Sequence, residues 1–340
     1  MAIKTADCLK AVKAYPAVDV DTGLWFQENY KLNSWFYIGR GNCGGDEMVF
    51  LYHAILFQYP GVASILVSSL TFTNRTTGEH HMDSQVYSKE DAEFATDRFR
   101  VKCPNAEIYG DINEMRIKAQ APFGGIDVKV VPVGTPLYNS NTGLYRMLDM
   151  DVHQYALPTM ESEGKLRLGD KEFDFTGNVW LDRQWQIDFS LSPEEEEGGM
   201  DLTKIPTWGW MSIKLENGET LSAWFPKSGD GDWAAWATVL HPDGAHALVH
   251  AENIFATADN WYHNDDSPFT YPTKYTLRIP EYDAELVVSS DLPDQEVRNE
   301  EIGAFDYYEG ACSVTGTWKG QPIRGFAFLE MIGVWMKDML

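Results

Sequence analysis

The segment richest in side chains that could do chemistry is residues 177–185, which read Gly-Asn-Val-Trp-Leu-Asp-Arg-Gln-Trp. On a β-strand, alternate side chains point to opposite faces. Trp180, Asp182 and Gln184 would therefore share one face. The other face would carry Val179, Leu181, Arg183 and Trp185. An indole ring beside a carboxyl group removes water from it, which disfavours the charged form and raises its pKa. Asp182 is thus our candidate catalytic acid near neutral pH.

An equally good interpretation gives Asp182 a structural role, as the partner of an arginine in a clasp between domains. Arg183 and Trp185 are expected to organise such an interface. Near the C-terminus, Phe326, Phe328 and Glu330 fall on one face of residues 325–331. Glu330 is then either a second inward-facing acid or a buried partner for Arg183, and we expect it to organise the interface too.

Aromatic pairs at strand spacing occur elsewhere in the chain. Trp35 and Tyr37 share a face of one expected strand, and Trp208 and Trp210 share a face of another. Core packing explains any one pair, but several together indicate the rim of a cavity. The expected substrate-binding residues are Trp180, Tyr37, Trp35, Trp208, Trp210 and Phe328.

Three other patterns in the sequence carry no chemistry. Residues 39–44 spell G-x-G-x-x-G, but an apolar strand-like run follows them, whereas a nucleotide site needs a helix there. His80 and His81 would point to opposite faces of a strand, and Cys8, Cys43, Cys103 and Cys312 form no C-x-x-C pair. The sequence also lacks a G-x-S-x-G elbow, a P-loop and an H-E-x-x-H motif. We therefore expect no metal and no organic cofactor.

Strands must position these residues, because period-2 alternation and turn signals recur throughout while helical stripes are scarce. Helix is expected only over residues 10–15 and 89–97. The expected strands are residues 34–39, 48–58, 63–73, 114–121, 126–133, 171–188, 209–215, 221–226, 234–240, 274–279, 284–289, 311–319 and 321–331. Many up-and-down strands with short turns predict an all-β fold of barrels or sandwiches.

Length favours two domains, since 340 residues are many for one core. The acidic, glycine-rich stretch 192–207 places the boundary, which gives domains 1–191 and 192–340 packed together. A net charge of −24 excludes nucleic acid and anionic membrane surfaces as partners. The apolar run 48–67 is divided by Pro60-Gly61 and predicts a hairpin, not a membrane span. Without an apolar signal segment over residues 1–15, a cytoplasmic location is expected.

The segment 177–185 resembles the G-x-x-W-x-D-R-Q-W signature of the AttH/CrtC group of the lipocalin-like superfamily. Residues 35–37, 307–310 and 325–333 resemble other strands of that group. Two positions depart from the pattern: Ser34 replaces an acid, and Gln186 replaces a glycine. The resemblance implies two lipocalin-like barrels with a pocket at or near their interface. It also implies chemistry on apolar, unsaturated substrates, which in the group ranges from water addition to Diels–Alder cyclisation.

These observations lead to three hypotheses about function. The first is a cofactor-independent cyclase or isomerase that folds an apolar polyketide or isoprenoid in specialised metabolism, with Asp182 as acid. The second is a hydratase, in which the same acid protonates an isoprenoid alkene and water captures the cation. The third is a lipocalin-like carrier that binds a lipophilic ligand without changing it.

Overall fold

A computed structural model describes residues 16–58, 63–148, 150–187, 207–227, 233–255, 260–265, 269–299, 306–333 and 335. Two compact units divide the chain. Unit 1 comprises Met1–Arg146 and Met150–Phe189, and unit 2 comprises Met147–Asp149 and Ser190–Leu340. The predicted boundary between residues 191 and 192 lies within 188–206, outside the described residues, and stays a prediction. Among the described residues, no helix is both long and apolar enough to cross a membrane.

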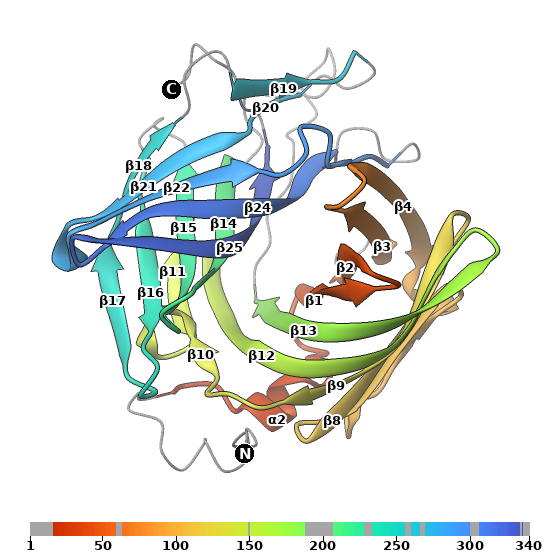
Figure 1. Cartoon of the computed structure of the whole chain (residues 1–340). Coiled ribbons are helices and arrows are strands. Elements are labelled where there is room, and N and C mark those ends of the chain that lie inside the picture. The colour runs from red at the N-terminus through yellow and green to blue at the C-terminus, as the bar shows by residue number, and fades with distance from the viewer. Residues whose placement is uncertain are drawn as a thin grey trace, which may run out of the picture. The chain divides into compact units, whose positions relative to one another are not determined.

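Unit 1 is built on one 13-stranded sheet of described strands, in the order β4-β3-β2-β1-β13-β12-β9-β8-β7-β6-β5, with β10 and β11 also paired to β12. Figure 1 shows this sheet curling from β4 through β1 and β13 towards β8. A short helix, α2 (Val20–Gly23), precedes it, with Asp19 as its N-cap. The strands are β1 (Leu32–Cys43), β2 (Asp46–Phe57), β3 (Ile65–Asn74), β4 (Glu79–Ser88), β5 (Glu93–Phe94), β6 (Phe99–Cys103), β7 (Ala106–Asp111), β8 (Glu114–Ala121), β9 (Gly124–Pro132), β10 (Leu137–Tyr138), β11 (Leu144–Met147), β12 (Met150–Leu168) and β13 (Lys171–Gln186).

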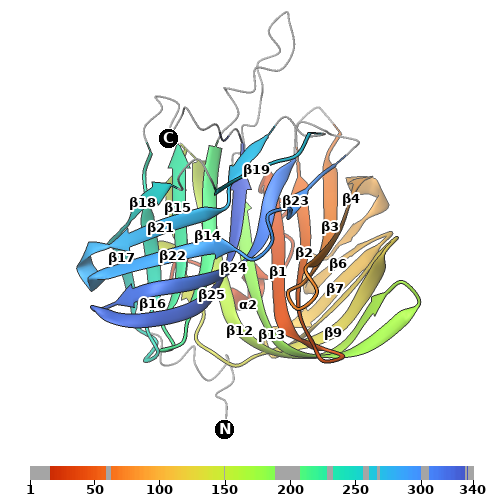
Figure 2. The ribbon, with the colours of Figure 1, turned by 45° about the horizontal axis from the view of Figure 1, so that its top comes forward.

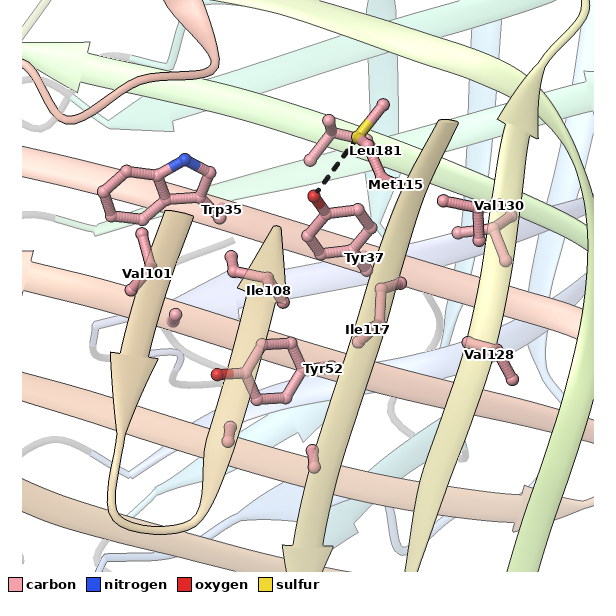
Figure 3. Close-up of a cluster of buried hydrophobic side chains, with 14 of the residues drawn as sticks. Trp35, Tyr37, Tyr52, Val101, Ile108, Met115, Ile117, Val128, Val130 and Leu181 are labelled. Carbon is pink, nitrogen blue, oxygen red and sulfur yellow. Dashed lines mark hydrogen bonds between the residues drawn. The ribbon is translucent and has the colours of Figure 1, made fainter. Parts of the chain in front are cut away.

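Large apolar side chains fill the inside of the curled sheet. Figure 3 shows Trp35 and Tyr37 among aliphatic residues of β6, β7, β8 and β9, and the Tyr37 hydroxyl reaches Met115 Sδ at 3.7 Å. Trp35 and Tyr37 both have 0% of their surface exposed. The sheet thus closes over its own side chains, as lipocalin-like half-barrels do.

Unit 2 repeats this plan with a 10-stranded sheet of described strands, in the order β17-β16-β15-β14-β25-β24-β22-β21-β18, with β23 paired to β24 (Figures 1 and 2). A separate two-stranded sheet pairs β19 with β20. The strands are β14 (Thr207–Leu215), β15 (Thr220–Lys227), β16 (Trp236–Leu240), β17 (His246–His250), β18 (Glu252–Phe255), β19 (Trp261–His263), β20 (Thr270–Pro272), β21 (Lys274–Ile279), β22 (Ala284–Ser290), β23 (Glu296–Val297), β24 (Tyr307–Trp318) and β25 (Gln321–Ile332).

The two sheets share one topology. In each, the first four strands form a meander, and the first strand then pairs with the last strand of the same sheet, β1 with β13 and β14 with β25. The predicted all-β fold with two lipocalin-like domains is therefore confirmed.

The apolar run 48–67 forms an antiparallel pair of strands, β2 with β3, as predicted. The helix expected over 89–97 is wrong: only a 3-10 turn, Lys89–Asp91, forms before β5 begins. The helix expected over 10–15 lies outside the described residues. The long strand β12 was missed, because Pro158 interrupts its pattern at a register shift between Leu157 and Met160.

The G-x-G-x-x-G sequence has a purely structural explanation. A Cβ on Gly39 would lie 2.1 Å from the Phe50 ring, and one on Gly41 would lie 2.2 Å from the Thr176 carbonyl oxygen. Gly44 has φ +64° in the turn between β1 and β2, where a side chain would be strained. The motif ends β1 and leads into β2, so a strand follows it, as predicted from the apolar run after residue 47.

Candidate functional site

Asp182 lies on β13, which pairs with β1 on one side and with β12 on the other. It stands opposite Phe36 of β1 and Ala156 of β12. The flanking residues Leu181 and Arg183 point to the inside of unit 1, whereas Trp180 and Asp182 point to the other face, as the predicted alternation requires. Asp182 is only 5% exposed, so its carboxyl group is largely removed from water.

One oxygen of this carboxyl is held by an amide. Gln154 on β12 donates from Nε2 to Asp182 Oδ1 at 2.8 Å. The hydroxyl of Tyr145 on β11 donates to Gln154 Oε1. Because Oε1 already accepts from this hydroxyl, the amide can turn only its NH₂ group towards Asp182. The carboxyl thus has a fixed orientation on a face that also carries Trp180.

Arg183 is the organising residue of unit 1, and it does not clasp a carboxylate. All five of its N–H donors bind neutral acceptors, at distances of 2.6 to 3.1 Å. The acceptors are the carbonyl oxygens of Gly23, Trp25, Ser34 and Gln184, and Asn33 Oδ1. Burial lowers the pKa of Arg183 to about 9, so the guanidinium keeps its charge at neutral pH.

One prediction about Arg183 is corrected by this geometry. A pair with Glu330 is wrong, because no donor of the guanidinium is left for it. Arg183 is also not the arginine of an Asp182 clasp. It instead fastens the segment after α2 to the inside of the sheet. The indole of Trp35 supports the same segment, since its Nε1 donates to Leu24 O at 2.8 Å.

The predicted pocket residues Trp35 and Tyr37 belong to the core of unit 1. They stand opposite Arg183 and Leu181 in the β1–β13 register, on the face that Asp182 does not share. Their assignment to a pocket with Asp182 is therefore corrected. Trp185 lies in the same core, where its ring stacks on His153 with centroids 5.3 Å apart.

The sequence interpretation missed a histidine on the Asp182 face. His53 of β2 stands opposite Phe36, with ring centroids 4.8 Å apart in an edge-to-face contact. Its Nε2 lies 2.9 Å from the Ser34 hydroxyl, while Nδ1 has no hydrogen-bond partner among the described residues. Burial lowers the pKa of His53 to about 3, so the imidazole is neutral. A neutral ring with an open nitrogen can orient a polar group of a ligand.

In unit 2, four predicted residues share one face of the sheet. Trp208, Trp210 and Ser212 on β14 stand opposite Ile332, Glu330 and Phe328 on β25. The Trp208 Nε1 donates to Glu330 Oε1 at 2.8 Å, and the Trp210 Nε1 donates to Ser222 Oγ at 2.9 Å. A second acid, Glu309 of β24, stands opposite Glu330 and was not predicted to function.

In the described ranges, no cluster of three or more His, Cys, Asp or Glu side chains is placed to hold a metal ion.

The fold and the buried acid of the signature strand define an all-β protein of the lipocalin-like superfamily. The chain belongs to the AttH-like family, whose model matches residues 58–334. A curated relative, the dehydratase asqC of Emericella nidulans, is 25% identical over 228 residues, which cover 64% of this chain and 61% of the relative. The chain therefore matches about three-fifths of the length of that relative.

Solved structures show the same fold. A putative AttH protein of Nitrosomonas europaea has a TM-score of 0.79 at 17% identity, covering 96% of this chain and 99% of that one. Kievitone hydratase of Nectria haematococca has a TM-score of 0.78 at 18% identity, covering 98% of both chains. CghA with Sch210972 has a TM-score of 0.62 at 11% identity, covering 95% of both.

Proposed function

We propose that this protein is an enzyme of specialised metabolism that binds an apolar, unsaturated small molecule and promotes its cyclisation or isomerisation without an organic cofactor. The observation that carries the proposal is the buried carboxyl of Asp182, held at Oδ1 by the Gln154 amide on the face that carries Trp180.

The chemistry follows from the surroundings of that carboxyl. Ionising a carboxyl group away from water is costly, so a buried acid with a neutral amide partner is suited to donating a proton or a hydrogen bond. The indole of Trp180 adds an apolar surface, and its face can stabilise positive charge that develops on a substrate. Holding a flexible substrate in a reactive conformation can lower the barrier by about 7 to 11 kcal/mol in favourable cases.

A second candidate is hydration or dehydration of an alkene or alcohol. The likeness to a dehydratase and the fold shared with kievitone hydratase favour it. In this reaction Asp182 would protonate the alkene, and water would capture the cation; dehydration is the reverse. Both candidates need the same acid, and they differ in whether the product gains or loses a water molecule.

The test begins with cells from which this gene is deleted. The apolar compound that accumulates in them is incubated with purified protein in water enriched in ¹⁸O, and the product is analysed by mass spectrometry. An unchanged mass with a new structure supports cyclisation or isomerisation. A gain or loss of one water molecule supports the second candidate. A compound that binds and is recovered unchanged would contradict both and indicate a carrier.

The role of Asp182 is tested in the same assay with Asp182→Asn. We expect kcat to fall by at least about 100-fold, as for loss of a general acid. Asp174→Asn is the matched control, because Asp174 lies on the same strand with 85% of its side chain exposed. Both variants must unfold at urea concentrations close to that of the wild type. An Asp182→Asn variant that is inactive because it is unfolded would favour a structural role.

A further inference from the structure

The shared topology of the two sheets places a second acid in the position that Asp182 occupies in the first. The last strand of each sheet carries an aromatic residue, a leucine and an acid in sequence. These tripeptides are Trp180-Leu181-Asp182 on β13 and Phe328-Leu329-Glu330 on β25. In both, the leucine points into the core of its own unit. Each acid also stands opposite an aromatic residue of the first strand, Phe36 or Trp210.

Glu330 differs from Asp182 in its partner on the preceding strand, which is another acid. Glu309 stands directly opposite it and is 1% exposed. Neither oxygen of Glu309 accepts a hydrogen bond from a protein donor, and no Lys, Arg or His in the described part of the chain pairs with either acid. Two adjacent buried carboxylates repel each other, so the pair retains a proton.

The surroundings decide which acid holds that proton. Burial, and then the charge of Glu330, raise the pKa of Glu309 well above its usual range. Burial raises the pKa of Glu330 too, but hydrogen bonds from the Trp208 indole and from Glu309 oppose the shift. The Trp208 indole donates to Glu330, whereas Glu309 accepts from no donor among the described residues, so the geometry assigns the proton of the pair to Glu309 and the negative charge to Glu330. Glu330 is also the more accessible of the two, because it is only partly buried.

A row of indole rings lies beside the pair on the same face of the sheet. Trp236, Trp224 and Trp210 stand opposite one another across β16, β15 and β14, and Glu330 follows Trp210 in the same row. The rings of Trp210 and Trp224 are 6.2 Å apart. Trp210 and Trp224 are only 2% and 3% exposed, so the surface that a ligand can reach beside the carboxylate belongs to the partly exposed rings of Trp208 and Trp236.

We propose that Glu330 is a general base of unit 2 that moves a proton on an apolar, unsaturated substrate lying against Trp208, with Glu309 as its positioning residue. Glu330 removes a proton from a carbon next to a double bond that is conjugated with a carbonyl group of the substrate. The electrons of the C–H bond form a new double bond, and those of the original double bond move towards the carbonyl oxygen and return to form the new C–H bond. The proton then passes from Glu330 to the far carbon of the original double bond, which isomerises the alkene. In an elimination it passes instead to the departing hydroxyl, which leaves as water. Glu309 keeps its own proton throughout and shares it with Glu330.

This inference rests on the proposed function, because it needs the same class of substrate. The first measurement, however, needs no substrate: infrared difference spectroscopy of protein labelled with ¹³C-glutamate detects a protonated carboxyl group. The wild type should show this absorption at neutral pH. It should vanish in Glu309→Gln and persist in the control Glu285→Gln, whose carboxyl is exposed and paired with Arg278. If the absorption persists in Glu309→Gln, the protonated carboxyl group is not that of Glu309, and the inference is wrong.

The second measurement follows uptake of deuterium from D₂O into the compound that accumulates in the deletion strain. We expect Glu330→Gln to slow exchange by at least about 100-fold. Glu309→Gln should slow it less and lower kcat more than it changes KM. The glutamine amide in Glu309→Gln can still donate a hydrogen bond to Glu330. If Glu309 had only a structural role, Glu309→Gln would therefore keep full activity, and only Glu309→Leu would lose it. A wild type that converts nothing contradicts the proposed function. A wild type that reacts while Glu330→Gln matches its rate contradicts only this inference.

Discussion

The guanidinium of Arg183 lies over the indole ring of Trp35, with its Cζ 4.3 Å from the ring centroid. The two residues stand opposite each other in the β1–β13 register, and both are fully buried. A buried cation held by carbonyl oxygens and a ring face is stable only while every donor is used. The signature Arg183 is thus explained by the architecture of unit 1.

Replacing Arg183 should therefore destabilise the fold strongly. Arg183→Met keeps the apolar stem but leaves the buried carbonyl oxygen of Gly23 without its side-chain donor. We expect a loss of about 3 to 5 kcal/mol in the free energy of unfolding, measured by urea titration. Arg98→Met is the control, because Arg98 is 61% exposed and pairs only with Asp97 among the described residues, and its loss should stay below about 0.5 kcal/mol. Equal losses in the two variants would contradict the assigned role.

The neutral His53 predicts a pH dependence of stability. Its pKa is about 3 in the folded protein and near 6.5 when unfolded, so below pH 6.5 the unfolded chain binds a proton that the folded protein does not. Stability is then lost as the pH falls from about 6.5 towards 3. Between pH 7 and pH 5 the wild type should lose about 2 kcal/mol more than His53→Gln does.

Urea titrations at the two pH values check this difference. His250→Gln removes an exposed histidine instead and should behave like the wild type. If His53→Gln and the wild type lose stability in parallel, the imidazole takes up no proton on unfolding and the prediction is wrong.

A side chain at Gly39 should destabilise the protein because it would collide with the ring of Phe50, and a smaller residue at position 50 should relieve the collision. A Cβ there would lie 2.1 Å from the ring of Phe50, its partner across the β1–β2 ladder. We expect Gly39→Ala to cost about 1 to 3 kcal/mol and Phe50→Leu to recover part of that loss in the double variant. Gly134→Ala, whose Cβ would meet its nearest atom at 3.3 Å, should cost less. Additive losses for Gly39→Ala and Phe50→Leu would count against the close contact.

Tyr145 should matter for turnover through Gln154. Tyr145→Phe removes the hydroxyl that orients the amide, so Gln154 can rotate away from Asp182. We expect about 1 kcal/mol less stability and a decrease in kcat smaller than that of Asp182→Asn. Tyr109→Phe is the control, because the Tyr109 hydroxyl has no hydrogen bond among the described residues. Unchanged kcat in Tyr145→Phe would show that the orientation of the amide does not matter.

The sequence alone predicts which side chains of one strand share a face of the sheet. It does not predict which side chains of two different strands share a face. The split between Trp180 with Asp182 and Leu181 with Arg183 follows from the period of two alone. Placing Trp35 and Tyr37 beside Asp182 failed because it also needs the register of β1 on β13, and a shift of one residue exchanges the faces.

The register of two hairpins could nonetheless have been predicted from the sequence. Centring the first hairpin on Gly44 and Gly45 pairs Phe36 with His53, as the structure does. That step would have brought His53 onto the Asp182 face. The pairing of Glu309 with Glu330 follows in the same way from the turn at Lys319 and Gly320. By contrast, nothing local in the sequence indicates that Gln154, on the bulged strand β12, reaches Asp182.

The junction of β1 with β13 has a consequence for how the protein is made. Nearly every other strand pair of unit 1 joins near neighbours in the chain, and such hairpins close quickly. The seam between β1 and β13 must wait until the rest of the unit has been synthesised, because its halves come from opposite ends of that unit. Phe36 and Asp182 meet only at that seam. A partly synthesised or partly folded chain therefore holds finished hairpins but lacks the contact between Phe36 and Asp182, which forms only when assembly is complete.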